Sequence, residues 1–306
     1  MSEAIPLSAR ESRVVPRPKD KSRILRVIER HLRACGVDRT QPVLIVGGGQ
    51  DDLEILSACG FSQIVLSNLA GTGMILDAEH IDLPDNSYPV VFAHAVLHHC
   101  RSPQKALGEM VRVSQKHVFF MEPNECGTLR MLVRLGFSFP YEIGGVANNG
   151  YMGGLRNGPI PNYIYRWTER EVLKSVLTYH PERQFEVRSQ PYWDFYVNEE
   201  DLLARKETKL AALASKLGAR HFIVFLRLAQ ALLSIFPLLR SQGNKFFCAI
   251  SKRDLQPWIE VRADQYCVRR DWVSIVTPRT GGQALAECES RTQPFREPFR
   301  EELKRR

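Results

Sequence analysis

The stretch VLIVGGGQDD, residues Val43–Asp52, decides the fold of this chain. It joins an apolar run to three glycines, Gly47, Gly48 and Gly49, and then to two acids. A short, continuous apolar run is typical of a strand that is buried on both faces of a sheet. A glycine-rich turn directly after such a strand lets a ligand approach the backbone at the carboxyl edge of a parallel sheet. The stretch therefore predicts an α/β protein with a ligand site at this turn.

Strands and helices alternate on both sides of this turn. Apolar runs typical of buried strands recur along the chain, and patterns with helical spacing separate them. This alternation is typical of a parallel sheet covered by helices on both faces. The predicted strands lie at residues 42–46, 62–68, 88–96, 116–124, 184–193 and 244–253, and the predicted helices at 21–36, 51–60, 103–114 and 168–180. A helical insertion at 199–240 precedes the last strand.

The chain outside this domain has little pattern. We expect a flexible tail at residues 1–20, one domain over residues 21–253 and an irregular extension at 254–306. The tail is polar and lacks the apolar core of a signal peptide. The seven cysteines are scattered and form no CxxC pair, which favours reduced thiols over disulfides or a zinc site. We therefore expect a cytoplasmic protein without a metal site.

The charge pattern gives no sign of nucleic-acid binding. The formal net charge is +8, but the excess arginines lie largely near the two ends of the chain, and no basic patch is interleaved with aromatics. Residues 221–239 are apolar, although Arg227 and Gln230 interrupt them. We expect a buried helix there, and an interfacial helix that contacts a membrane peripherally is the alternative.

The loop at residues 144–167 is rich in glycine, asparagine and aromatic residues and has no period. A loop of this length inside a compact domain is usually functional or disordered, and its aromatic residues argue against disorder. We predict a lid that contacts the substrate through Tyr163, Tyr165, Arg166 and Trp167, with Arg166 on an anionic group. The alternative is that Tyr165 and Trp167 pack against the following helix.

The glycine turn favours a ligand with a cationic group. It departs from the dinucleotide pattern G-x-G-x-x-G, because Asp52 stands in the place of the third glycine. Asp51 and Asp52 also put negative charge where a pyrophosphate would lie. An NAD-dependent oxidoreductase is therefore disfavoured. S-adenosylmethionine, which carries an ammonium and a sulfonium, suits this turn better.

The next part of the chain supports this ligand. LDAEHIDLPDNSYPVVFAHAVLHHCRSPQKALGEMVRV, residues Leu76–Val113, resembles the core of class I S-adenosylmethionine-dependent methyltransferases. The resemblance covers about residues 42–124, and residues 160–172 are similar to a subgroup of the same family. It implies a Rossmann-like sheet, S-adenosylmethionine as cofactor, and methyl transfer to a small-molecule, glycan or lipid acceptor.

The resemblance also implies roles for single residues. The glycine turn would line the methionine part of the cofactor, Asp77 would accept a hydrogen bond from the adenine amino group, and Asn68 would bond to the ribose. The implied cofactor residues are Gly47, Gly48, Gly49, Asn68, Asp77, Ala78, Ala93 and His94.

Three side chains are candidates for chemistry on the acceptor. We predict His98 or His99 as a general base for an acceptor of low acidity, and Glu122 as a residue that orients an acceptor hydroxyl. The alternative roles are structural: one histidine bonds to backbone while the other packs, and Glu122 caps the turn before Pro123.

The chain departs from the family at three positions. Ile45 and Asn68 stand where the family usually has acids, and Asp51 stands where it usually has a glycine. As a neutral partner, Asn68 should hold a ribose less strongly than a carboxylate. A methyltransferase-like domain that acts as a binding or scaffold protein without catalysis is therefore the alternative.

Overall fold

A computed structural model describes residues 22–71, 73–195, 202, 209–263, 265–269 and 271–272. The chain divides into two compact units, one of residues 1–180 and 185–252 and the other of residues 181–184 and 253–306. The predicted tail at residues 1–20 and the last 34 residues of the predicted extension lie outside the described residues.

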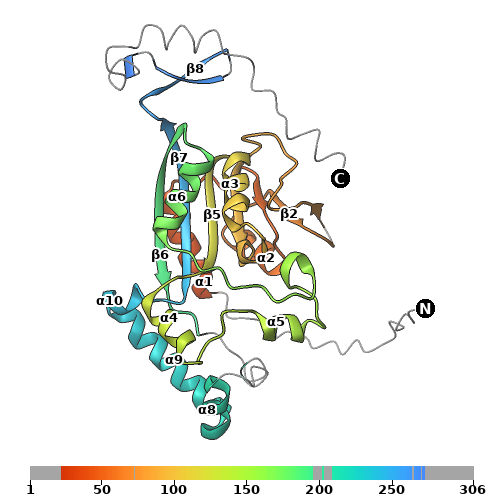
Figure 1. The fold of residues 1–306 in the computed structure, drawn as a ribbon, viewed down its shortest axis with the longest axis vertical. Helices are drawn as coiled ribbons and strands as arrows, with labels where there is room; N and C mark the ends of the chain where they lie inside the picture. The colour runs from red at the N-terminus through yellow and green to blue at the C-terminus, as the bar shows by residue number, and fades with distance from the viewer. Residues whose placement is uncertain are drawn as a thin grey trace, which may run out of the picture. The chain divides into compact units, whose positions relative to one another are not determined.

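A sheet of seven strands organises the first unit within the described residues, in the order β3-β2-β1-β4-β5-β7-β6 (Figure 1). Strands β1 to β5 run parallel to one another, and β7 runs antiparallel to β5. The predicted Rossmann-like sheet is confirmed. Its strands are β1 Val43–Ile45, β2 Ile64–Asn68, β3 Met74–Ile75, β4 Tyr88–His94, β5 Ser114–Pro123, β6 Arg183–Tyr192 and β7 Lys245–Leu255.

Helices cover both faces of the sheet, as predicted. One hydrophobic cluster contains side chains of α3 (Pro103–Val113) and α6 (Glu169–Tyr179), and the other contains side chains of α1 (Ser22–Ala34) and α2 (Gln50–Ala58) (Figure 1). Successive strand residues alternate between the clusters because strand side chains point to opposite faces. The continuous apolar run of β1 is therefore explained by burial on both sides.

Arg112 on α3 holds the loop that leads into β4. Its guanidinium donates to the carbonyl oxygens of Ile81 (2.6 Å) and Leu83 (2.7 Å), and it pairs with Glu109 (2.8 Å). Glu109 in turn accepts from the N–H of Ile81 (2.9 Å). Two parts of the family-like stretch, the LPDN loop and the arginine of EMVRV, are thus joined by hydrogen bonds that position β4.

Several short elements were not predicted. The loop at 144–167 contains helical turns. The C-terminal extension forms a hairpin at residues 259–268, so the prediction of an irregular extension was wrong for these residues. These elements are too short to show a hydrophobic period. They are α4 Gly127–Arg134, α5 Ile143–Asn148, the 3-10 turns η1 Leu97–His99 and η2 Leu155–Asn157, the strand β3, and the hairpin strands β8 Ile259–Arg262 and β9 Gln265–Val268.

The described part of the helical insertion consists of α8 Lys209–Leu217, α9 Ala219–Ile235 and α10 Pro237–Arg240. It leads into β7, whose first residue, Lys245, pairs with the last residue of β5, Pro123. The expectation of a buried helix at 221–239 was wrong, because α9 buries only the side around Phe222 and leaves a broad apolar face exposed. Taken singly, every helix among the described residues is too short or too polar to cross a membrane; α8 and α9 reach that length and apolarity together, with a bend of 116° between them.

Candidate functional site

The glycine turn after β1 lies at the carboxyl edge of the sheet and is closely packed on one side. Gly47 has φ +66°, and a Cβ there would lie 2.5 Å from Val96 Cγ1. A Cβ on Gly48 would lie 2.2 Å from the Ile45 side chain, whereas nothing lies within 4 Å of one on Gly49. The turn therefore requires glycine at its first two positions and is open at the third.

Asp52 joins this turn to the end of β4. Its Oδ2 accepts from the N–H of Gly49 (2.9 Å), and its Oδ1 lies 2.8 Å from Nδ1 of His94. The acid that replaces the third glycine of the dinucleotide pattern thus caps α2 and holds His94. This carboxylate occupies the place where a pyrophosphate would otherwise lie on the helix N-terminus.

Asn68, at the end of β2, also holds the turn. Its Nδ2 donates to the carbonyl oxygen of Gly48 (3.1 Å), and its Oδ1 accepts from the N–H of Leu69 (2.8 Å). Both polar groups of the side chain therefore have protein partners.

An arginine of the loop at 144–167 reaches the predicted adenine acid. Arg156 lies 3.5 Å from Asp77 Oδ2 and 3.0 Å from Glu79 Oε2. Burial alone would raise the pKa of Glu79, but hydrogen bonds from Arg156 and from backbone N–H groups lower it. Asp77 accepts from the N–H of Glu79 (2.9 Å), and the side chain of Ala78 packs against the core. The loop therefore covers this end of the sheet edge.

Three predicted contact residues have other roles. The side chains of Ala93 and Trp167 are fully buried in the core, so neither can touch a ligand directly. Trp167 packs its ring edgewise on Phe120 and Tyr165, and it shares a hydrophobic cluster with Val172 and Val176 of the following helix, α6. Arg166 turns back to the loop and donates to the carbonyl oxygen of Phe139 (3.3 Å). The prediction that Trp167 contacts the substrate was wrong.

Glu122, the last acid of β5, is 1% exposed and acts on the turn after β4. Its Oε1 accepts from the N–H groups of Val96 (2.8 Å) and Leu97 (2.7 Å). Its Oε2 lies 2.5 Å from Nδ1 of His98. Because both oxygens are engaged and buried, the predicted direct contact with an acceptor hydroxyl was wrong. Glu122 is a positioning residue for His98.

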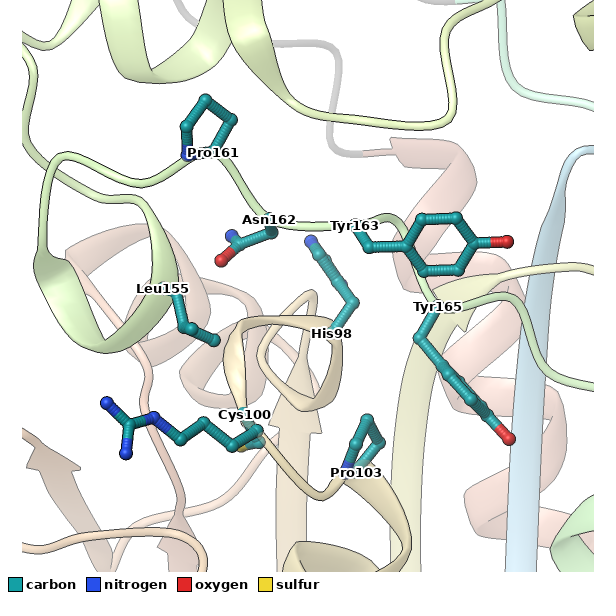
Figure 2. A pocket seen from close by; sticks show the side chains of 9 residues that line it. His98, Cys100, Pro103, Leu155, Pro161, Asn162, Tyr163 and Tyr165 are labelled. Atoms are coloured by element: carbon teal, nitrogen blue, oxygen red, sulfur yellow. The ribbon is translucent and has the colours of Figure 1, made fainter.

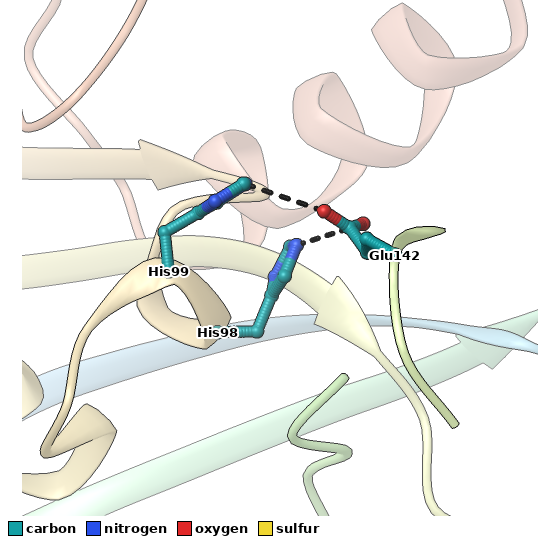
Figure 3. A group of neighbouring side chains, drawn as sticks. All are labelled: His98, His99 and Glu142. Atoms are coloured by element: carbon teal, nitrogen blue, oxygen red, sulfur yellow. Dashed lines mark hydrogen bonds and ion pairs between the residues drawn. The ribbon is translucent and has the colours of Figure 1, made fainter. Parts of the chain in front are cut away.

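A second carboxylate, Glu142, meets both histidines of η1. Its Oε1 lies 3.2 Å from Nε2 of His98, and its Oε2 lies 3.8 Å from Nε2 of His99. Figure 3 shows both rings pointing to this carboxylate. Nδ2 of Asn162 contacts Nδ1 of His99, and the backbone carbonyl oxygen of Asn162 accepts from the N–H of Glu142 (2.9 Å). Neither partner was predicted from the sequence, because Glu142 and Asn162 lie in segments without a hydrophobic period.

The charges of these groups depend on one another. Burial alone would lower the pKa of His98, but the Glu122 and Glu142 carboxylates raise it to about 9. Burial would raise the pKa of Glu142, yet the hydrogen bond and charge of His98 lower it to about 2. Burial lowers the pKa of His99. With a carboxylate at each ring nitrogen, His98 holds a proton on both and has no free lone pair. In this state it cannot be the predicted base.

A cavity of about 270 Å³ opens beside His98 (Figure 2). Tyr163 and Tyr165 lie on its wall together with Asn162, so the structure brings two of the four predicted substrate residues to the histidines. The hydroxyl of Tyr165 is itself held, because it donates to Glu171 (2.8 Å). The lining residues are His98, Cys100, Arg101, Pro103, Leu155, Pro161, Asn162, Tyr163 and Tyr165.

Comparisons with known proteins agree with the predicted family. Residues 60–121 match the sequence model of the family described as "Methyltransferase domain". No curated protein matches the chain. One solved structure similar to this chain is a complex from Haloferax volcanii. It contains the Trm112 methyltransferase activator and a protein described as a methyltransferase. That match has 10% identity and a TM-score of 0.42, and it covers 76% of this chain and 90% of that chain.

Two further solved structures are similar to this chain. A phosphoethanolamine N-methyltransferase of Haemonchus contortus matches at 13% identity with a TM-score of 0.38, covering 74% of this chain and 51% of that chain. A SAM-dependent methyltransferase of Aquifex aeolicus matches at 14% identity with a TM-score of 0.36, covering 77% of this chain and 99% of that chain. Residues 60–121 thus match the methyltransferase-domain family, and the sheet that contains them has a Rossmann-like fold.

Proposed function

We propose that this protein transfers a methyl group from S-adenosylmethionine to an acceptor seated in the cavity beside His98. The match of residues 60–121 to the methyltransferase-domain family carries this proposal. That segment includes Asp77, the acid expected at the adenine, and His98, which lines the cavity. Both follow strands of the parallel sheet, and ligands of such sheets bind at the carboxyl edge.

The residues at the glycine turn fit S-adenosylmethionine. Gly47 and Gly48 allow the close turn, and the open side of Gly49 leaves room for the methionine part. The carboxylates of Asp52 and Asp77 lie at this edge, where they already meet His94 and Arg156. When bound, this cofactor supplies a methyl group on a positively charged sulfur. His94 and Asn68 would complete its site.

The cavity supports an acceptor with both apolar and polar parts. Tyr163 and Tyr165 offer aromatic surface, while Asn162 and His98 offer polar groups. In the transfer, a lone pair of the acceptor forms the bond to the methyl carbon while the carbon–sulfur bond breaks. The electron pair of that bond would stay on sulfur, and the proton of the acceptor would pass to solvent water. A water-poor, oriented site is what such a displacement needs from the protein.

The alternative, a binding or scaffold protein without catalysis, also has structural support. Asn68 stands where the family has the ribose acid, and both of its polar groups already bond to Gly48 and Leu69. A ribose would have to compete with these partners. Binding of the cofactor separates the two functions.

The first test is cofactor binding by the purified full-length protein. S-adenosylmethionine and S-adenosylhomocysteine are expected to raise its stability, by about 2.7 kcal/mol at a hundred times the dissociation constant. Asp77→Ala should weaken this binding about tenfold or more, since a hydrogen bond to a charged group contributes about 1.5–3 kcal/mol. Thermal melting and calorimetric titration measure both effects.

Asp82→Ala, an exposed acid in the next loop, is the matched control and should bind as the wild type does. If neither adenosyl ligand binds at millimolar concentration, the scaffold function is favoured. Stabilisation by NAD(H) alone would overturn the proposed activity.

We further propose that the protein is cytoplasmic, that α9 and α10 place it on a membrane surface, and that the acceptor is a lipid or a lipid-linked molecule. Five apolar side chains lie on one face of α9 at helical spacing, each at least 56% exposed. Residues 209–240 contain five lysines and arginines and no acid. An apolar face flanked by cations suits an anionic lipid surface. The face consists of Val224, Phe225, Leu228, Leu232 and Ile235.

Flotation with anionic vesicles tests this membrane contact. The triple variant Phe225→Ser, Leu228→Ser and Leu232→Ser is expected to lose flotation, because burying each of the replaced side chains contributes about 1.5–3 kcal/mol. A triple serine variant of Leu173, Tyr179 and Trp258, which are exposed elsewhere, should float like the wild type. If the protein does not float and instead dimerises through α9, the face is a protein interface.

A further inference from the structure

Three side chains of metal-ligating types converge beside the cavity, and His98 would give up its Nε2 proton on binding a cation. Their ligand atoms are Nε2 of His98, Nε2 of His99 and a carboxylate oxygen of Glu142, all within 4.8 Å of one another. Two ligands bound to one tetrahedral zinc ion lie about 3.4 Å apart, given metal–ligand distances near 2.1 Å. Nε2 of His98 lies 3.2 Å from Oε1 of Glu142 and Nε2 of His99 lies 3.8 Å from Oε2, so each imidazole is near this distance from one of the two carboxylate oxygens.

A buried carboxylate fixes the orientation of the first imidazole. Oε2 of Glu122 lies 2.5 Å from Nδ1 of His98, and the side chains of both residues are almost fully buried. A proton on Nδ1 is thereby favoured, which directs Nε2 toward Glu142. A carboxylate on the far nitrogen of a histidine is the usual outer-shell partner of a metal-bound imidazole.

Asn162 serves the second imidazole in the same way. Its side chain is 1% exposed, and its Oδ1 has no hydrogen-bond partner among the described residues, whereas its Nδ2 is in close contact with Nδ1 of His99. Turning the amide over places Oδ1 on Nδ1, which then donates to it. This orientation leaves a lone pair on Nε2 of His99, opposite Glu142. It puts the amide nitrogen in the buried position that has no partner among the described residues, and it gives up the 3.5 Å hydrogen bond from Nδ2 to Glu142.

Both imidazoles point to the same carboxylate (Figure 3). A single cation bound between them would have all three side chains as ligands. We propose that His98, His99 and Glu142 bind a divalent transition-metal ion of the zinc class, with Glu122 and Asn162 as its outer-shell partners.

This ion would act on the acceptor of the proposed methyl transfer, and to that extent the inference rests on the proposed function. Two imidazoles and one carboxylate leave at least one coordination position for another ligand, as in catalytic zinc sites. His98 and Asn162 both line the cavity, so an acceptor oxygen there can reach the ion. Coordination lowers the pKa of a bound hydroxyl. The metal site thus takes over the task that protonated His98 cannot perform as a base.

The test is metal binding itself, measured on the full chain after treatment with a chelator and dialysis. Zinc is titrated calorimetrically, and cobalt is titrated by visible absorption, which reports low-coordinate nitrogen and oxygen ligands. One ion per chain is expected. His99→Ala and Glu142→Gln should abolish stoichiometric binding, and Asn162→Ala should weaken it about 10- to 100-fold. His221→Ala, an exposed histidine on α9, is the control and should bind as the wild type does.

Two results would overturn the metal site. One is the absence of stoichiometric zinc and cobalt binding by the wild type, and the other is wild-type affinity in both His99→Ala and Glu142→Gln. Far-ultraviolet circular dichroism of each variant checks that it is folded. His99 and Glu142 are both partly exposed, so we expect their variants to fold. Binding of S-adenosylmethionine is measured on the same samples. If S-adenosylmethionine binds and the metal does not, only the proposed metal site fails. If the metal binds and S-adenosylmethionine does not, only the proposed methyltransferase activity is contradicted.

Discussion

Replacement of Trp167 by alanine is expected to lower the free energy of unfolding by about 3–5 kcal/mol, the usual cost of removing a large buried aromatic side chain. Trp167 is fully buried and packs against Phe120 of β5. Its backbone is also fixed, because its N–H donates to the carbonyl oxygen of Pro123 and its carbonyl accepts from the N–H of Glu125, both at 2.9 Å. The site can collapse little, so a cavity remains.

Urea denaturation followed by far-ultraviolet circular dichroism measures this loss. Trp167→Phe should lose less, because it keeps one ring and removes an indole N–H that has no partner among the described residues. Leu173→Ala, an exposed residue of the neighbouring helix α6, should change stability by no more than about 0.5 kcal/mol. A loss below about 1 kcal/mol in Trp167→Ala would place this tryptophan outside the core, where the substrate-contact role could be revived.

The strands of this sheet could be predicted because each carries its own signal. An apolar run between turn residues identifies a strand regardless of its partners, and β1, β2, β4 and β5 were all found this way. Strand β3 has two residues and gives no such signal. The loop at 144–167 was recognised as special by composition, but composition does not say which side chains point inward.

The site was predictable as far as strand ends define it. His94 ends β4, His98 follows that strand and Glu122 lies near the end of β5, so a parallel sheet brings them to one edge without knowledge of the loops. Glu142 and Asn162 could not be placed, because their position depends on contacts formed 44 and 63 residues away in sequence. Sequence alone therefore found the histidines and missed the groups that set their charge.

Trp167 shows why the same loop misled. The end of the loop looks exposed from the sequence because it follows a glycine-rich segment. The backbone of Trp167 nevertheless pairs with that of Asn124, directly after β5. That pairing continues the sheet edge by one residue and turns the indole into the core. No local sequence pattern distinguishes the buried Trp167 from Tyr163, which lies four residues earlier and is 56% exposed.

Glu122→Ala is the second substitution expected to have a large effect, lowering the free energy of unfolding by about 3–5 kcal/mol, as when one member of a buried ion pair is removed. The change leaves the N–H groups of Val96 and Leu97 without their acceptor and leaves Nδ1 of His98 unpaired in the interior. Buried donors without partners are costly. Urea denaturation measures the loss, and Glu125→Ala, which removes a surface pair with Arg130, should cost at most about 1 kcal/mol.

Glu122→Gln separates this structural role from the role in the metal site. The glutamine keeps an oxygen for the N–H groups of Val96 and Leu97, so its loss of stability should be well below that of the alanine variant. Its amide nitrogen, however, faces Nδ1 of His98 and donates to it. The ring must then carry its proton on Nε2, the atom proposed to bind the metal. The glutamine variant should therefore remain folded and bind zinc about 10- to 100-fold more weakly, and wild-type zinc affinity in this variant would show that His98 is not a ligand.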